Sequence, residues 1–175
     1  MKKNYLTQIQ NSMHRISKNN NAVFIGQTVS NPGSLIFSSL SKVSKDKRIE
    51  LPLFEETQMG MAIGLSLSGF IPVCCYPRFD FFILALNQTV NHLDKINKMS
   101  SYQHSPFVIT RVLVGSKKPI YAGLQHSQNH TGALRLMLKF TEIVELKNPK
   151  IIYKEYQKAL TQRKSKIFIE YSQYY

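Results

Sequence analysis

Apolar residues along the chain recur either at helical spacing or in short unbroken runs. Residues 3–18 carry apolar side chains three or four positions apart, which predicts an amphipathic helix in the N-terminal segment 1–20. The same spacing predicts helices over residues 79–93 and 150–163. Short apolar runs bounded by glycine, proline or polar residues are typical of buried strands in a parallel sheet. The predicted strands cover residues 22–26, 71–76, 107–114, 142–146 and 166–170.

Further helices are predicted between these strands, so the two kinds of element alternate along the chain. They are expected over residues 35–40, within 52–69 and over 130–139. Polar stretches at 44–48 and 115–129 are predicted loops. This alternation predicts an α/β fold, a three-layer sandwich in which helices cover both faces of a mostly parallel sheet. The length of 175 residues leads us to expect a single domain over 1–175.

Composition agrees with a folded domain, since 43% of the residues are hydrophobic and 19% are charged. Apolar runs stop short of the roughly 18 residues that span a bilayer. No apolar core follows the basic residues near Met1, so we expect no signal peptide. Cys74 and Cys75 are adjacent in a predicted strand and should point to opposite faces, where they cannot bond each other. The lack of a disulfide framework predicts a cytoplasmic protein.

The net charge is +13, from 23 basic and 10 acidic residues. Nucleic-acid binding is one explanation. The basic residues are nevertheless scattered over several predicted elements, and the aromatic residues lie mostly in apolar runs. An acidic partner subunit or an anionic substrate explains the charge equally well through electrostatic steering.

The stretch from Pro52 to Gly69 combines an acidic pair with small residues. Pro52 disfavours helix just before it, and Glu55 and Glu56 follow where a helix N-terminus favours negative charge. Glycines four apart, at 60 and 64, keep the predicted helix slim, so another backbone or a flat ligand can approach it closely. On the residues alone, a buried helix that begins with two solvated glutamates is the competing interpretation.

Three later segments join this stretch in one pattern. Residues 69–73 have a glycine, two residues and then a proline leading into a strand. Residues 79–91 contain Phe-Asp-Phe and, further on, a glutamine followed by an asparagine three positions later, and residues 125–128 are Gln-His-Ser-Gln. In order and spacing, the four segments resemble the pyrimidine-binding domain of thiamine-diphosphate enzymes. The resemblance is to the beta subunit of 2-oxoacid dehydrogenases, of the pyruvate and branched-chain types, within the transketolase group.

This resemblance implies the thiamine-diphosphate-binding fold of the pyrimidine-binding type, with roles for three residues. Glu55 matches the glutamate that bonds the ring nitrogen of the cofactor's aminopyrimidine and so activates the cofactor. Phe81 matches the aromatic residue that stacks on that ring, although a buried core phenylalanine is the alternative. His126 matches the histidine that reaches the reacting end of the cofactor, where it contacts substrate and can act as acid or base. Glu56 is adjacent to Glu55 and should point elsewhere.

Other polar residues remain open to two interpretations. Arg111 lies in the strand that leads to the His126 loop, where it could bind an anionic substrate or form a structural ion pair. His130 lies four residues after His126, but the pair lacks further metal ligands, and we expect no metal site in this chain. Gln27 stands where the family carries an acidic residue.

The family binds the cofactor's diphosphate through Mg²⁺ with a Gly-Asp-Gly motif, and this sequence contains none. The resemblance therefore predicts neither a diphosphate-binding domain nor a C-terminal transketolase domain here. It implies a partner subunit that carries Gly-Asp-Gly and binds Mg²⁺, in a two-fold hetero-oligomer that is active only when assembled. The expected reaction is 2-oxoacid decarboxylation or dehydrogenation, or two-carbon transfer from a ketose. A scaffold or regulatory subunit that kept the fold without activity is the alternative.

Overall fold

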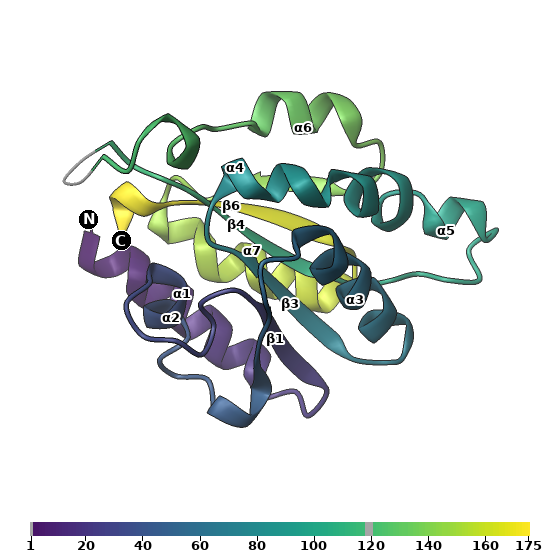
Figure 1. Cartoon of the computed structure of the whole chain (residues 1–175). Coiled ribbons are helices and arrows are strands. Elements are labelled where there is room, and N and C mark those ends of the chain that lie inside the picture. Colours follow the sequence, from purple (N-terminus) through teal and green to yellow (C-terminus); the bar gives the residue numbers. More distant parts are fainter. Residues whose placement is uncertain (1, 118–120) are drawn as a thin grey trace.

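A six-stranded parallel sheet forms the centre of the molecule (Figure 1). The structure is a computed structural model, and it describes residues 2–117 and 121–175. The strand order is β2-β1-β3-β4-β6-β5, and each neighbouring pair is parallel. The strands are β1 (Ala22–Gly26), β2 (Arg48–Glu50), β3 (Ile71–Tyr76), β4 (Ile109–Val114), β5 (Glu142–Glu145) and β6 (Lys166–Tyr171).

Helices cover both faces of the sheet and divide the core in two (Figure 1). One hydrophobic cluster lies between the sheet and α1 (Lys2–Ser17), α2 (Leu35–Ser39) and α7 (Pro149–Gln162). The other lies between the sheet and α3 (Glu55–Leu67), α4 (Phe79–Phe82) and α6 (Thr131–Met137). The expected three-layer α/β fold is confirmed.

The central strands are buried on both faces, which explains why they appear in the sequence as continuous apolar runs. All six residues of β3 are buried, and so are all six of β4 and of β6. Cys74 packs in the cluster with α3, and Cys75 packs in the cluster with α1, as strand alternation predicts. Burial raises the pKa of Cys74 to about 12 and that of Cys75 to about 11, so both thiols stay protonated and unreactive.

The predicted helix over residues 79–93 is not one regular helix. The segment continues from α4 into a 3-10 turn, η2 (Ile83–Ala85), and then a π-helix, η3 (Asn87–Leu93). The Thr89 hydroxyl donates to the Ala85 carbonyl at 2.8 Å, and the Asp94 N–H donates to the Thr89 carbonyl at 3.0 Å. The second bond spans five residues, which is the π-helical spacing. Local side-chain bonding of this kind does not show in the apolar periodicity.

Other differences are at the periphery. The predicted loop over 44–48 contains a 3-10 turn, η1 (Lys45–Lys47), and leads into the edge strand β2. Additional short elements are α5 (Ile96–Met99), η4 (Leu124–His126) and η5 (Ser172–Tyr174). Of the predicted loop over 115–129, residues 118–120 lie outside the described residues. No helix in the described ranges has the length and apolar character needed to cross a membrane.

Candidate active site

A cavity of about 260 Å³ opens at the carboxyl ends of β1 and β3. After β1 the chain turns toward β2 at one edge of the sheet, and after β3 it turns toward β4 on the other side. This is a topological switch point, where open parallel sheets bind their ligands. The residues lining the cavity come from five segments, and they are Gln27, Thr28, Ser34, Leu53, Glu55, Tyr76, Pro77, Arg78, Phe81 and His126. The three site residues expected from the sequence, Glu55, Phe81 and His126, therefore meet in one cavity.

Glu55 is the first residue of α3 and is only 6% exposed. The buried hydroxyl of Tyr76 donates to the Glu55 carbonyl at 3.1 Å and so anchors this helix start to the end of β3. The partial positive charge of the helix N-terminus favours the Glu55 carboxylate. The neighbouring Glu56 is exposed and accepts a hydrogen bond from the Asn87 amide at 2.8 Å, so it points toward η3.

Phe81 keeps its ring 38% exposed, while its neighbours Phe79 and Phe82 are buried in the core. The Phe81 ring meets the His126 ring edge-on, with 5.3 Å between ring centroids and 87° between the planes. The alternative that Phe81 is a core residue is therefore excluded. An accessible aromatic face next to a half-buried imidazole can stack against a flat ligand.

Two residues that the sequence analysis did not single out position the His126 segment. A Cβ added to Gly115 would lie 1.7 Å from the His126 carbonyl oxygen, so only glycine fits at the end of β4. Asp80 accepts two hydrogen bonds from Gln128, from its backbone N–H at 3.2 Å and from its side-chain amide at 2.9 Å. The Phe-Asp-Phe segment thus contacts the Gln-His-Ser-Gln segment through both Asp80 and Phe81. Asp80 could have been identified from the sequence, because it is a polar residue between two aromatic residues, Phe79 and Phe81.

The floor of the cavity near β1 is uncharged. Gln27, which is 4% exposed, donates to the Gln58 side-chain oxygen at 2.9 Å. Gln58 in turn donates to the Cys75 carbonyl at 2.9 Å. Gln27 therefore presents a neutral amide, held in place by Gln58, at this side of the cavity.

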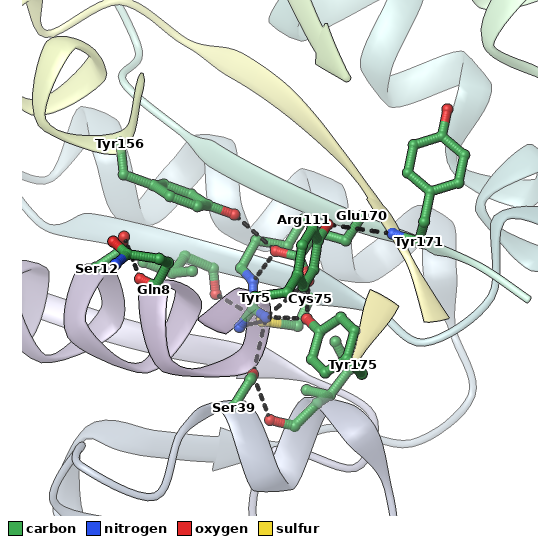
Figure 2. A network of polar contacts seen from close by, with 12 residues as sticks. Tyr5, Gln8, Ser12, Ser39, Cys75, Arg111, Tyr156, Glu170, Tyr171 and Tyr175 are labelled. Atoms are coloured by element: carbon green, nitrogen blue, oxygen red, sulfur yellow. Dashed lines mark hydrogen bonds and ion pairs between the residues drawn. The ribbon is translucent and has the colours of Figure 1, made fainter. Parts of the chain in front are cut away.

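Arg111 is not part of the cavity, and the structure corrects the expectation that it binds substrate. It is fully buried and forms a bidentate pair with Glu170, at 2.7 Å from Nε and 2.9 Å from Nη2 (Figure 2). Nη2 also donates to the Ser39 hydroxyl at 2.8 Å. The Arg111 side chain points to the α1, α2 and α7 face, away from the cavity, because alternate residues of β4 face opposite sides. Of the two interpretations, the structural ion pair is correct.

Tyrosine hydroxyls complete this buried network (Figure 2). Tyr156 donates to Glu170 at 2.7 Å, and Tyr175 donates to the other carboxylate oxygen. Burial by itself would raise the pKa of Glu170, but the Arg111 guanidinium and the two hydroxyls outweigh it and hold that pKa below its ordinary value. Burial likewise works against the Arg111 cation, yet the Glu170 carboxylate raises its pKa above the usual value.

The cavity contains a different arginine, Arg78, which directly precedes α4. His130 does not join the cavity lining. Its ring packs edge-on against Phe79, with 5.5 Å between centroids. Within the described ranges, no group of three or more His, Cys, Asp or Glu side chains is arranged to hold a metal ion.

No family model matches the chain. Sequence comparison finds the beta subunit of the pyruvate dehydrogenase E1 component from Bos taurus, 33% identical over 84 residues, which is 47% of this chain and 23% of that subunit. The corresponding subunit from Rickettsia felis is 29% identical over 92 residues, 53% of this chain and 28% of the subunit. The matches thus span about a quarter of the length of these curated relatives.

Structural comparison extends the likeness over nearly the whole chain. A solved structure of a split-gene transketolase, an inactive β4 tetramer, superposes with a TM-score of 0.67. The match covers 94% of this chain and 49% of that one, at 16% sequence identity, and it shows a shared fold. Motifs, sequence similarity and fold agree that this chain resembles the pyrimidine-binding domain found in pyruvate dehydrogenase E1 beta subunits and split transketolases.

Proposed function

We propose that the chain is the pyrimidine-binding subunit of a split thiamine-diphosphate-dependent enzyme, with Glu55 as the residue that activates the cofactor. The observation that carries the proposal is the cavity itself. It gathers Glu55, Phe81 and His126 from three motifs that lie far apart in the sequence.

The cavity residues fit the cofactor's aminopyrimidine. The Glu55 carboxylate lies at a helix start beside the accessible ring of Phe81, which suits a flat heteroaromatic ring that can share a proton. His126 is half-buried and in contact with Phe81, where it can act as an acid or base toward a substrate. Thiamine diphosphate, when bound, supplies the nucleophilic carbon and takes up the negative charge left when a bond next to a carbonyl breaks.

The partner is inferred from what the 175 residues lack. They contain no Gly-Asp-Gly, so residues beyond these 175 would bind the diphosphate and Mg²⁺, and we place them on a partner subunit in a two-fold hetero-oligomer. The split-gene transketolase neighbour is inactive as a β4 tetramer, and by analogy this chain alone would not catalyse. Its free thiols suit a cytoplasmic location.

The retained cavity favours an enzyme subunit over a non-catalytic scaffold. Decarboxylation or dehydrogenation of a 2-oxoacid and two-carbon transfer from a ketose all begin with attack on a carbonyl. Each of them is compatible with Glu55, Phe81 and His126 in the roles given above.

Co-purification from the native source, followed by mass spectrometry, identifies the partner. In the reconstituted complex, Glu55→Gln should lower turnover at least about 100-fold, because the amide cannot share the ring proton. Glu56→Gln, one residue away and directed toward Asn87, is the matched control and should leave turnover unchanged. Full turnover in the Glu55→Gln complex would refute the proposed mechanism.

A further inference from the structure

We propose that Arg78 binds the carboxylate of the substrate, which makes the substrate class a 2-oxoacid. The inference rests on the proposed function, because it assigns the substrate of the same cavity. Of the described residues that line the cavity, Arg78 alone carries a permanent positive charge.

The hydrogen bonds of Arg78 leave donors available. One Nη1–H donates to the Pro77 carbonyl at 2.7 Å. The Nε atom is buried and has no hydrogen-bond partner within the described part of the chain. The ion pairs formed among the described residues do not include Arg78. Because a guanidinium has five N–H donors in a fixed plane, its two Nη atoms keep further donors that match the two oxygens of a carboxylate.

Two other arginines, Arg111 and Arg48, bind several groups of the protein outside the cavity. Arg111 is occupied by Glu170 and Ser39 on the opposite face of the sheet. Arg48 donates through its Nη atoms to the backbone carbonyls of Val29, Leu40 and Val43, although its Nε, like that of Arg78, is buried without a partner in the described chain. Arg78 differs from both because it lines the cavity and, among the described residues, its guanidinium bonds only the Pro77 carbonyl.

Charge balance in the cavity requires a cation for an anionic substrate. Glu55 lines the same space, and its carboxylate repels a second negative charge. A guanidinium in the lining offsets that repulsion and draws the anion to one side of the cavity.

The position of Arg78 in the same cavity as His126 favours a carboxylate next to the reacting carbonyl over a more distant phosphate. Arg78 and His126, the residue assigned to the reacting end, border the same space of about 260 Å³. In a 2-oxoacid the carboxylate is bonded directly to the reacting carbonyl carbon, so both groups fit within this space. In a ketose phosphate the charge lies several bonds from the carbonyl.

Binding of pyruvate as the probe tests the inference, measured by saturation-transfer NMR on the full chain with and without its co-purified partner. Arg78→Gln should weaken pyruvate binding at least about tenfold. Arg78→Lys should recover part of the loss, since it keeps the charge without the planar donors. Arg15→Gln, which removes the same charge from the exposed face of α1, should bind as the wild type does. Thermal unfolding of each variant verifies that it folds.

Two comparisons separate the possible results. Methyl pyruvate, which lacks the charge, should bind equally to wild type and Arg78→Gln. Pyruvate binding that is unchanged in Arg78→Gln would overturn the inference, and so would Arg78-dependent binding of inorganic phosphate without binding of pyruvate.

Thiamine diphosphate binding, measured separately by calorimetry, should be the same in wild type and Arg78→Gln. If the wild-type complex bound no thiamine diphosphate while pyruvate binding depended on Arg78, the proposed function would fail and the anion site would stand.

Discussion

At the residue scale, the absence of a side chain at Gly115 sets the position of the catalytic candidate His126. The His126 backbone carbonyl lies where the Cβ of any other residue would be, at 1.7 Å. The obstructing atom belongs to the backbone, so the backbone around His126 would have to move to relieve the clash. His126 would then lose its contact with Phe81, although its own side chain is unaltered.

We therefore expect Gly115→Ala to lower the free energy of unfolding by about 1–3 kcal/mol and to displace the His126 ring. The matched control is Gly132→Ala in α6, where an added Cβ meets open space. The control should gain roughly 0.5–1 kcal/mol, because alanine suits a helix better than glycine. Urea unfolding measures the first effect, and the chemical shift of the His126 ring protons measures the second. An unshifted His126 signal in Gly115→Ala would contradict the expectation.

At the element scale, α3 carries both the carboxylate proposed to activate the cofactor, Glu55, and two glycines. Glu55 begins the helix, and Gly60 and Gly64 lie one turn apart in its interior. A Cβ added to Gly60 would contact the Gln88 side chain at 3.8 Å, whereas one added to Gly64 would meet nothing within 4 Å. Gly64 is exposed, so packing within this chain does not require glycine there.

Gly64→Ala should therefore stabilise the isolated chain by about 1 kcal/mol and raise its Tm by roughly 2–4 °C. Gly33→Ala is the contrasting variant. It also has open space around an added Cβ, but its φ of +102° strains any L-residue, and its Tm should fall. Calorimetry of Gly64→Ala and Gly33→Ala measures the two changes in Tm. A Gly64→Ala chain that melts below wild type would show that α3 needs glycine at that position for its own fold.

At the scale of the whole molecule, the Arg111–Glu170 pair connects elements from both ends of the chain. Its partners come from α2 (Ser39), α7 (Tyr156) and the C-terminal Tyr175 (Figure 2). Tyr5 of α1 accepts a hydrogen bond from the Tyr171 backbone N–H at 3.3 Å beside this network. Unfolding exposes all of these groups together, so the network should govern the acid stability of the entire fold.

The direction in which stability changes with pH follows from the lowered pKa of Glu170. A carboxyl group with a depressed folded-state pKa contributes stability that is fully present above its unfolded pKa of about 4.3 and is lost as the pH falls through the folded value. Wild-type stability should therefore fall steeply below about pH 4.

Glu170→Gln should be less stable at neutral pH by about 3–5 kcal/mol, because Arg111 stays buried without its counter-ion. The stability of this variant should also depend less on pH in the acid range. Urea unfolding between pH 7 and pH 3 measures both, with the exposed Glu56→Gln as control. Parallel pH profiles for wild type and Glu170→Gln would exclude this role.

Much of the architecture could be predicted because buried elements carry their own periodicity. The runs at 22–26 and 71–76 coincide with β1 and β3, since these strands are covered on both faces. The edge strand β2 was missed because Arg48 and Glu50 leave no apolar run to detect. The π-helical turn of η3 was missed because the apolar spacing over 79–93 does not distinguish an α-helix from a π-helical turn.

The sequence by itself determined the order of the buried strands and long helices, since local spacing is a property of contiguous residues. Through its motifs it also made Glu55, Phe81 and His126 the candidate site residues. Only the tertiary structure decided which arginine borders the cavity. Arg111 and Arg78 both lie close to the predicted site in sequence, but the direction of a strand side chain depends on how the strand pairs and which helices cover each face. β4 turns Arg111 into the core with Glu170, and the end of β3 brings Arg78 to the cavity. Side-chain direction relative to a sheet is set by long-range pairing, which no single segment of the sequence contains.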